Sequence, residues 1–360
     1  MYRKILKEVF LYITAGFIIW YCCILIINGV SIKEGITEAI ERCLNVIIPS
    51  LFAFMAMSEI ITESGLYSKI SAPFALVSKY ILKIPPQLFF IFLLGNIAGY
   101  PVGIKLLSSM TQKKQISKRT AEIMSCFCYC GGPAFYSGTI GIAVFGNTRA
   151  GIIIFLSIVI TNLLMSAVLC RIFKIEENSF KKEISISPQL FTDSIISAGK
   201  SLFTICILVV FFSTVMSAAE HYRIFEILQS LGFSENAVTL FKSLLEITAI
   251  SELSGQPFGL LPMAAAVCSF GGICVIIHVI ALNKKAFPLK MFMASRLVSA
   301  LLSAVFCNIL SEFILPDSIP AAAITKSCFV KTDNFIPSIC LILMILLLMM
   351  KKRLAFSKKL

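Results

Sequence analysis

Amide, carboxylate and ammonium groups interrupt several long apolar stretches of this sequence, and they are its first candidates for chemistry. Asn96 and Lys105 lie within one such stretch, and Glu246 and Thr248 lie within another. A charge at the centre of a bilayer costs at least about 2.5–3.5 kcal/mol, so intramembrane polar groups usually face a bundle interior or a water-filled cavity. We therefore expect Asn96, Glu246 and Thr248 to contact a solute or a coupling ion. Lys105 could neutralise an anionic group or pair with Glu246.

Four other ionisable residues have simpler interpretations. Glu59, Lys200 and Arg296 lie near the ends of apolar segments, where charged side chains can extend to the membrane interface. We expect these three side chains to lie at that interface. His278 stands alone in its apolar stretch, and we interpret it as a hydrogen-bonded packing residue rather than a proton relay.

The sequence lacks the motifs of several enzyme classes. It has no phosphate-binding loop, no His-Glu-x-x-His motif and no Gly-x-Ser-x-Gly motif. Cys126, Cys128 and Cys130 alternate, but no histidine or further cysteine pair lies nearby to complete a four-ligand metal site. We therefore expect no enzyme, no cofactor and no metal site. An intramembrane enzyme that combines these cysteines with His278 is an alternative, and it requires the groups to converge in space.

The composition identifies the environment of these residues. Of the 360 residues, 58% are hydrophobic and 14% are charged, and the mean hydropathy is +0.91. Soluble domains are nearer to ~45–50% apolar and ~25% charged, so soluble and disordered proteins are excluded. The net charge of +13 comes from basic clusters between apolar stretches, which is typical of cytoplasmic loops and not of a nucleic-acid site. The chain is expected to be a multi-pass protein of the cell membrane, in contact with the lipid bilayer.

Uncharged stretches predict the membrane spans. Residues 9–28, 151–170 and 201–219 are long enough to cross a hydrocarbon core of ~30 Å as helices. Further spans are expected to begin near residues 46, 297 and 335. Because backbone hydrogen bonds cannot stay open in lipid, the fold class is an all-α polytopic helix bundle. The basic clusters at residues 3–7, 113–119, 284–290 and 351–359 place both termini in the cytoplasm.

Three apolar regions contain clusters of glycine and proline. They cover residues 84–104, 123–148 and 253–283, and the candidates for structural breaks are Gly95, Pro101, Gly103, Gly131, Gly132, Gly271 and Gly272. Such clusters leave backbone groups unpaired unless the segment faces protein or water, so they predict broken or re-entrant helices. Ser125 and Ser269 precede the two glycine pairs and could offer hydroxyls, although a serine in a membrane helix often bonds to its own backbone.

Short identities suggest that the chain contains two related halves. Ser50-Leu51-Phe52 recurs as Ser201-Leu202-Phe203, and the two glycine pairs follow Phe127 and Phe270. Paired interrupted segments are a sequence indication of a transporter's central site. The predicted organisation is a transmembrane helix over 1–30, an amphipathic helix over 31–45, a first repeat over 46–173, a polar linker over 174–190, a second repeat over 191–315, and a helix with a basic tail over 316–360. The amphipathic helix lies either at the interface or against other loops.

Four short segments resemble a known family. They are Pro49-Ser50-Leu51-Phe52 with Ser58-Glu59, Gly95 to Gly103 followed by Lys105, Leu245-Glu246-Ile247-Thr248, and Ser269-Phe270-Gly271-Gly272. With these segments the chain resembles the YlbJ-type sporulation integral membrane proteins of the nucleoside-recognition (Gate) superfamily. The resemblance implies two Gate-like repeats, the membrane of a spore-forming bacterium and a role in making the spore. It also implies recognition of a nucleoside-like or other small solute.

Two functions follow as expectations. The first is a transporter or channel-like recogniser of a small solute or ion at a midplane site. Its candidate substrate-binding residues are Asn96, Gly99, Tyr100, Lys105, Ser125, Glu246, Thr248 and Ser269. The second is a non-transporting scaffold that assembles other sporulation membrane proteins.

Overall fold

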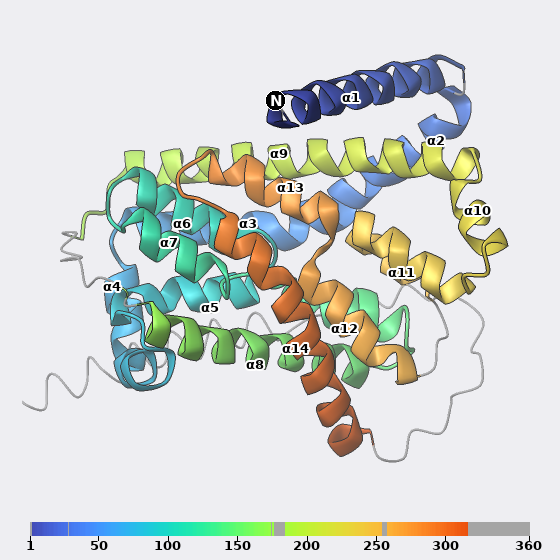
Figure 1. Ribbon diagram of the computed structural model, residues 1–360. Coiled ribbons are helices and arrows are strands. Elements are labelled where there is room, and N and C mark those ends of the chain that lie inside the picture. The colour runs from blue at the N-terminus through green and yellow to red at the C-terminus, as the bar shows by residue number, and fades with distance from the viewer. Residues whose placement is uncertain (1, 28, 174, 176–183, 254–257, 316–360) are drawn as a thin grey trace, which may run out of the picture. The chain divides into compact units, whose positions relative to one another are not determined.

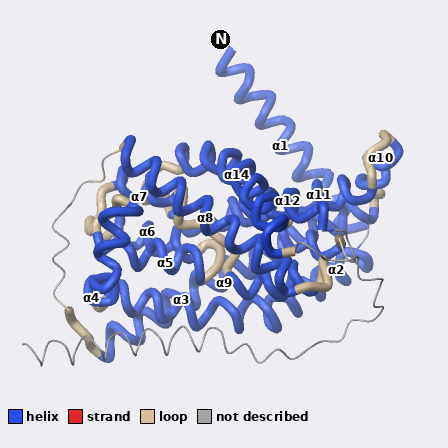
Figure 2. The backbone as a smooth tube through the Cα atoms, turned by 90° about the horizontal axis from the view of Figure 1, so that it is seen from below, coloured by secondary structure: helices blue, strands red, loops and turns tan. Residues whose placement is uncertain are grey.

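The computed structural model describes residues 2–27, 29–173, 175, 184–253 and 258–315 (Figure 1). Within these ranges every regular element is a helix, and Figure 2 shows helices joined by loops without strands. These helices belong to one unit, Met1–Asp317, while a second unit, Ser318–Leu360, lies outside the described residues. The span predicted near residue 335 also lies there.

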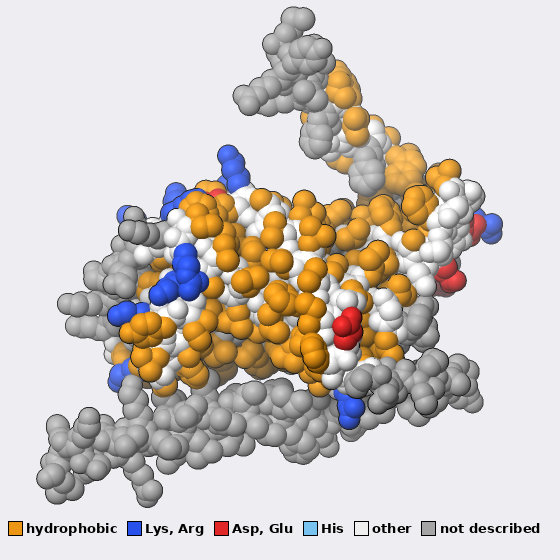
Figure 3. Space-filling model, turned by 60° about the horizontal axis from the view of Figure 1, so that its bottom comes forward, with side chains coloured by type: hydrophobic (Ala, Val, Ile, Leu, Met, Phe, Trp, Pro, Cys, Tyr) orange, Lys and Arg blue, Asp and Glu red, His pale blue; other side chains and the backbone are white. Residues whose placement is uncertain are grey.

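Several helices are long and apolar enough to cross a membrane. In the described part of the chain, five such stretches are Ile32–Glu63, Thr148–Ile172, Pro188–His221, Phe258–Asn283 and Lys290–Ile314. They confirm an all-α polytopic bundle. The long helices are α1 (Tyr2–Ile27), α3 (Ile48–Glu63), α8 (Thr148–Ile172), α9 (Pro188–His221) and α14 (Lys290–Ile314). Many apolar side chains on their outer faces are exposed, as lipid contact requires (Figure 3).

The first helix projects from the other helices of its unit in Figures 1 and 2. Its contacts with α9 lie near its C-terminal end, where the Tyr21 hydroxyl bonds with Thr214. The Trp20 ring lies 6.2 Å from the Tyr222 ring, which follows α9. The span predicted over 9–28 is therefore part of a helix that is fixed to the bundle at one end.

The predicted amphipathic helix is α2 (Gly29–Arg42), and it packs along α9. Ile32 and Ala39 are buried, and a Cβ atom added at Gly35 would lie within 3 Å of the Ser217 side chain. A wider turn over Cys43–Ile47 joins α2 to α3, so the two form one extended helical stretch. The apolar face of this helix therefore packs against a membrane helix rather than against loops.

The glycine- and proline-rich regions are interrupted helices. In the first half, α5 (Phe89–Ile97) breaks before α6 (Val102–Gln112), and α7 (Lys118–Ser125) breaks before a wide helix, η5 (Phe135–Ile142). In the second half, α11 (Glu235–Leu245) breaks before a 3₁₀ helix, η6 (Ile247–Glu252), and α12 (Leu261–Phe270) breaks before α13 (Gly272–Asn283). The remaining short α-helices are α4 (Tyr67–Ser71) and α10 (Ile224–Ser230), and further short 3₁₀ or wide helical turns are η2 (Ala72–Phe74), η3 (Val77–Leu82), η4 (Pro86–Leu88) and η7 (Phe258–Leu260).

The elements follow a similar order in the two halves. Each half begins with a long helix, α3 or α9, and ends with another, α8 or α14. The two interrupted helices of that half lie between them in the chain. The first long helices, α3 and α9, pack on each other, and so do the last ones, α8 and α14 (Figure 1). This pairing of like elements brings the interrupted segments of both halves between the long helices.

The two glycine pairs make equivalent close contacts. Gly132 has φ +81°, and a Cβ atom there would lie 2.9 Å from the carbonyl oxygen of Ile97, at the break between α5 and α6. Gly272 has φ +75°, and a Cβ atom there would lie 3.2 Å from the carbonyl oxygen of Ser243, near the break after α11. L-residues rarely adopt such φ values, so glycine allows the two breaks of each half to pack backbone against backbone.

Two basic turns lie on the same side of the molecule. The Ser108 hydroxyl on α6 donates to the carbonyl oxygen of Asn283 at 2.9 Å, which brings the ends of α6 and α13 together. Lys118 and Lys285, from the turns that follow these helices, border one shallow hollow. This placement agrees with the shared sidedness predicted for residues 113–119 and 284–290.

Candidate functional site

A polar cleft of about 450 Å³ lies between helices of both halves. Its walls come from α3 and α6 of the first half and from α9 and α13 of the second. The lining side chains are mostly charged or hydroxyl-bearing: Glu59, Lys105, Ser108, Ser109, Gln112, Asp193, Ser197, Lys200, Ser201, Thr204 and Lys284, with Ile196, Ala281 and Leu282. Membrane proteins place polar groups in bundle interiors and water-filled cavities, where such groups cost less than in lipid.

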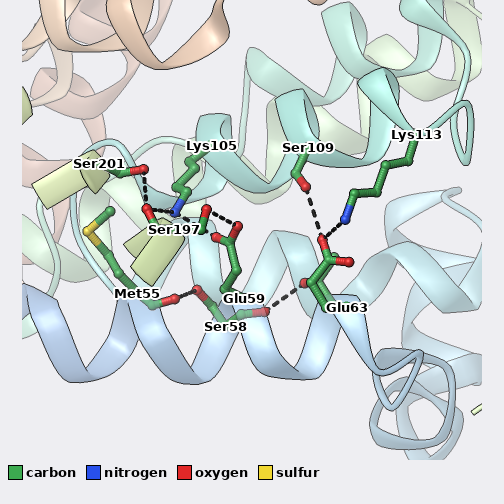
Figure 4. A network of polar contacts seen from close by, with 10 residues as sticks. Met55, Ser58, Glu59, Glu63, Lys105, Ser109, Lys113, Ser197 and Ser201 are labelled. Atoms are coloured by element: carbon green, nitrogen blue, oxygen red, sulfur yellow. Dashed lines mark hydrogen bonds and ion pairs between the residues drawn. The ribbon is translucent and has the colours of Figure 1, made fainter. Parts of the chain in front are cut away.

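An ion pair forms the inner end of this cleft (Figure 4). Lys105 Nζ on α6 lies 2.6 Å from Glu59 Oε2 on α3. The Ser197 hydroxyl on α9 donates to Glu59 Oε1 at 2.7 Å, and Lys105 Nζ donates to the Ser197 carbonyl oxygen at 3.2 Å. Glu59 is 5% exposed and Lys105 is 7% exposed. Three helices from both halves therefore meet at one buried ion pair.

A second ion pair lies one helical turn further along α3. Glu63 pairs with Lys113, which follows α6, and also accepts a hydrogen bond from the Ser109 hydroxyl at 3.3 Å (Figure 4). The spacing of Glu59 and Glu63 places both carboxylates on one face of α3. The two carboxylates on this face of α3 therefore pair with Lys105 on α6 and with Lys113 just after α6.

The charged side chains in the outer part of the cleft are Asp193, Lys200 and Lys284. Asp193 is exposed and accepts a hydrogen bond from the Gln189 side chain at 3.1 Å. Lys200 and Lys284 are exposed, and neither forms an ion pair with another residue that the structure describes. The mouth of the cleft therefore presents two free ammonium groups toward the basic turns.

Asn96 and Asn162 of the first half are buried and bond to each other and to backbone carbonyls, while Asn162 Oδ1 has no hydrogen-bond partner among the described residues. Asn96 Nδ2 donates to the carbonyl oxygens of Phe92 at 2.8 Å and Phe127 at 3.3 Å. Its Oδ1 accepts a bond from Asn162 Nδ2 at 2.7 Å, and Asn162 also donates to the Tyr129 carbonyl oxygen at 3.1 Å. This pair satisfies the carbonyls of the loop after α7.

Arg296 on α14 joins the breaks of the two halves. Its Nη2 donates to the carbonyl oxygen of Cys126, just after α7, and its Nη1 donates to that of Ser269 in α12 at 3.3 Å. The guanidinium also lies 4.7 Å from the centre of the Tyr129 ring and 4.8 Å from that of Phe292. Carbonyls at helix C-termini carry partial negative charge, so one cation is shared between two helix ends.

Tyrosine hydroxyls make a further connection between the halves. The Tyr100 hydroxyl donates to the carbonyl oxygen of Cys268 and lies 2.8 Å from the Tyr136 hydroxyl. The Tyr136 hydroxyl accepts a bond from the Gly131 amide at 2.9 Å. The interrupted segments therefore meet as predicted, but large side chains pack at their junction and the polar cleft lies elsewhere.

Glu246 and Thr248 belong to a third cluster. Glu246 Oε2 accepts bonds from the Thr248 amide, at 3.1 Å, and from the Thr248 hydroxyl, so it caps the helix η6. Arg42 donates to the Thr248 hydroxyl, and its Nη1 lies 3.7 Å from Glu246 Oε2. This cluster joins the C-terminal end of α2 to the break between α11 and η6.

Three expectations about polar partners are wrong. Glu59 and Arg296 do not reach the interface: α9 covers the first, and the second is 1% exposed because α14 begins almost two turns before it. Lys105 pairs with Glu59 and not with Glu246, which pairs with Arg42. Position along an apolar segment does not reveal which other helix covers a side chain.

The remaining predicted residues have local roles. The Ser125 hydroxyl donates to the Glu122 carbonyl oxygen in its own helix, and Ser269 uses its carbonyl for Arg296. Gly99 has φ +90°, beside the Gly131 carbonyl. Of the eight predicted substrate-binding residues, Lys105 is the one that lines the cleft. The i, i+4 spacing of Glu59 and Glu63 was the available sequence signal for the other wall.

The cysteines do not form a metal cluster in the described part of the chain. No group of three or more His, Cys, Asp or Glu residues there could hold a metal ion. His278 lies 3.8 Å from Cys274 Sγ on its own helix. The thiols of Cys126 and Cys130 lie near the Glu122 carbonyl and the Tyr136 hydroxyl. Among the described residues, no hydrogen bond joins His278 to this cysteine segment.

The chain is similar to the sporulation integral membrane protein YlbJ of Bacillus subtilis (strain 168). The two sequences are 22% identical over 334 residues, which cover 82% of this chain and 81% of the relative. The chain is a distant relative of YlbJ. The resemblance to YlbJ-type proteins is thereby confirmed. No protein-family model matches the chain, so its membership of the Gate superfamily stays a prediction. No solved structure matches either.

Proposed function

We propose that this chain is a sporulation-associated membrane protein that binds a small anionic solute in the cleft and moves it across the membrane. The relationship to YlbJ supports the link to sporulation. The observation that carries the transport proposal is the polar cleft between the two halves, with a buried ion pair at its inner end. No chemical conversion of the solute is part of the proposal.

The charge of the cleft favours an anion. Three lysines and two carboxylates line it, and Glu59 already neutralises Lys105 at the inner end. Lys200 and Lys284 remain available at the mouth, beside the basic turns. With three ammonium groups against two carboxylates the lining carries a net positive charge, and a field of that sign raises the local concentration of anions. An anion therefore gains attraction both on approach and within the cleft.

The lining also argues against a nucleoside as the preferred solute. Proteins commonly hold an unpaired base by stacking it on an aromatic ring. No aromatic side chain is found among the described residues that line the cleft. Hydroxyls such as those of Ser201 and Thr204 can instead donate hydrogen bonds to carboxylate or phosphate oxygens.

Binding and transport can be measured on the full chain in proteoliposomes, with radiolabelled phosphate, succinate and uridine as probes. We expect uptake of an anion and no uptake of uridine. Lys200→Gln and Lys284→Gln should each weaken anion binding about fivefold, the effect of roughly 1 kcal/mol for an exposed charge contact. Lys290→Gln is the matched control, because this exposed lysine does not line the cleft.

Two results would contradict the proposal. Uptake of uridine without uptake of either anion would favour the nucleoside assignment. Absence of flux and of binding for all three probes, together with normal spore formation by the Lys200→Gln Lys284→Gln double variant, would favour the non-transporting scaffold.

A further inference from the structure

We propose that Glu59 is the proton-binding group of the cleft, and that one proton binds to its carboxylate when the anionic solute binds. This inference rests on the proposed function, because it names the ion that accompanies the solute. The observation behind it is the position of a buried carboxylate in direct contact with the one ammonium group at the inner end of the cleft.

The geometry makes Glu59 and the solute competitors for the same cation. Lys105 Nζ already has Glu59 Oε2 at 2.6 Å and the Ser197 carbonyl oxygen at 3.2 Å. An anion that reaches Lys105 would bring a second negative charge beside the Glu59 carboxylate. Like charges in a poorly hydrated site repel strongly, so the ionised form of Glu59 opposes binding of the anion.

Protonation of Glu59 removes this opposition. A proton supplied by the buffered bulk solvent bonds to Oε2, which becomes the hydroxyl of a neutral carboxylic acid, while Oε1 keeps the bond donated by Ser197. Lys105 keeps its charge and becomes free to hold the solute. No bond of the solute changes, and the proton returns to water when the solute leaves. Each ligand therefore raises the affinity for the other, as thermodynamic linkage requires.

Other titratable groups face this site and have to be considered. They are Glu63 on α3, Lys105 on α6, Lys113 after α6, Asp193 and Lys200 on α9, and Lys284 and His278 on α13. Glu63 is paired with Lys113 away from the inner end, and Asp193 is exposed at the mouth. Of the described carboxylates that line the cleft, Glu59 is the buried one. It is therefore the carboxylate whose charge a solute at Lys105 experiences most directly.

The first test uses the full chain in lipid nanodiscs with radiolabelled sulfate, whose charge is constant between about pH 5.5 and about pH 7.5, so that a pH dependence of binding in this range belongs to the protein. Sulfate binding should tighten as the pH falls, by up to about tenfold per pH unit for one coupled proton. Glu59→Gln should bind sulfate tightly with an affinity that no longer changes with pH. Glu63→Gln and Asp193→Asn are the matched controls, and they should keep the wild-type slope.

The second test counts protons directly in weakly buffered solution. Addition of saturating sulfate, phosphate or succinate should cause the wild type to take up about one proton more than Glu59→Gln. Comparing the two proteins with the same probe cancels any titration of the probe itself.

The outcomes separate this inference from the proposed function. Anion binding with the same pH dependence in the wild type and in Glu59→Gln would overturn the proton assignment and leave the solute proposal standing. Loss of the slope in Glu63→Gln or Asp193→Asn, with the slope kept in Glu59→Gln, would also overturn it. Absence of anion binding at every pH in both proteins would overturn the proposed function and this inference together.

Discussion

Replacement of Arg296 tests whether one buried cation holds the interrupted helices of the two halves together. Arg296→Met keeps a long apolar side chain but removes the donors to the carbonyl oxygens of Cys126 and Ser269, and to the Ser295 hydroxyl. A buried acceptor left without its partner costs about 1–3 kcal/mol. The two carbonyls alone therefore give a loss of about 2–6 kcal/mol.

Two opposing contributions decide whether Arg296→Met lowers or raises the free energy of unfolding. Replacement of a buried ion pair by an apolar side chain is often neutral or stabilising, because the charge no longer has to be desolvated. Arg296, however, contacts carbonyl oxygens and aromatic rings rather than a carboxylate. The carbonyls stay buried after the substitution, so we expect the loss of their donors to dominate.

The assay is thermal unfolding of the purified full chain in detergent, measured at a fixed heating rate. We expect Arg296→Met to lower the Tm by about 3–8 °C, because an unfolding entropy of about 2.1 cal/mol/K per residue gives about 1.3 °C per kcal/mol for 360 residues. Arg171→Met is the matched control: this exposed arginine donates to the Ala167 carbonyl of its own helix, and its loss should change the Tm by less than about 2 °C. An unchanged or raised Tm for Arg296→Met would refute the reasoning.

Three further outcomes follow from the same structure. Gly272→Ala should destabilise the chain by about 1–3 kcal/mol, since φ is +75° there, whereas Gly199→Ala, with no atom within 4 Å, should be neutral or slightly stabilising in thermal unfolding. Lys285 follows Lys284, which lines the cleft beside the start of α9, and Arg223 follows the end of α9. Cysteine replacements of Lys285 and Arg223 should therefore react with impermeant thiol reagents from opposite sides of the membrane, after removal of the exposed native cysteines; labelling of both from one side would contradict a membrane crossing by α9. Lys105→Gln should reduce the yield of heat-resistant spores, and a wild-type yield would argue against the ion pair in function.

The spans and breaks could be predicted from the sequence, because their causes are local. Uncharged stretches predicted α8 and α9, and the glycine pairs predicted the interruptions after α7 and α12. Helix limits were less accurate. The Ser187 hydroxyl caps α9 by accepting from the Leu190 amide, with Pro188 at its first position. This start signal extends α9 well before residue 201 and brings Asp193 and Lys200 into the helix.

The partners of the polar side chains could not be predicted, since they depend on which helices pack together. Glu59 looked like an interface residue because its segment ends nearby, and only the packing of α9 on α3 buries it beside Ser197. Asn96 was a reasonable candidate for a cavity, but Asn162, distant in sequence, occupies its side chain. The sequence around Asn96 and the sequence around Asn162 do not specify that these two side chains contact each other.

The contacts between the halves differ in how easily they can be released, and this difference bears on transport. Near the breaks, Arg296 and Tyr100 bond to backbone carbonyls, which stay acceptors at every pH. At the cleft, the halves are joined through Ser197, whose two bonds involve the Glu59–Lys105 pair. A proton on Glu59 weakens that pair without touching the contacts at the breaks. In the proposed transport, a movement that exposes the inner end of the cleft would therefore have to loosen the packing of α9 on α3 while the junction around Arg296 stays closed.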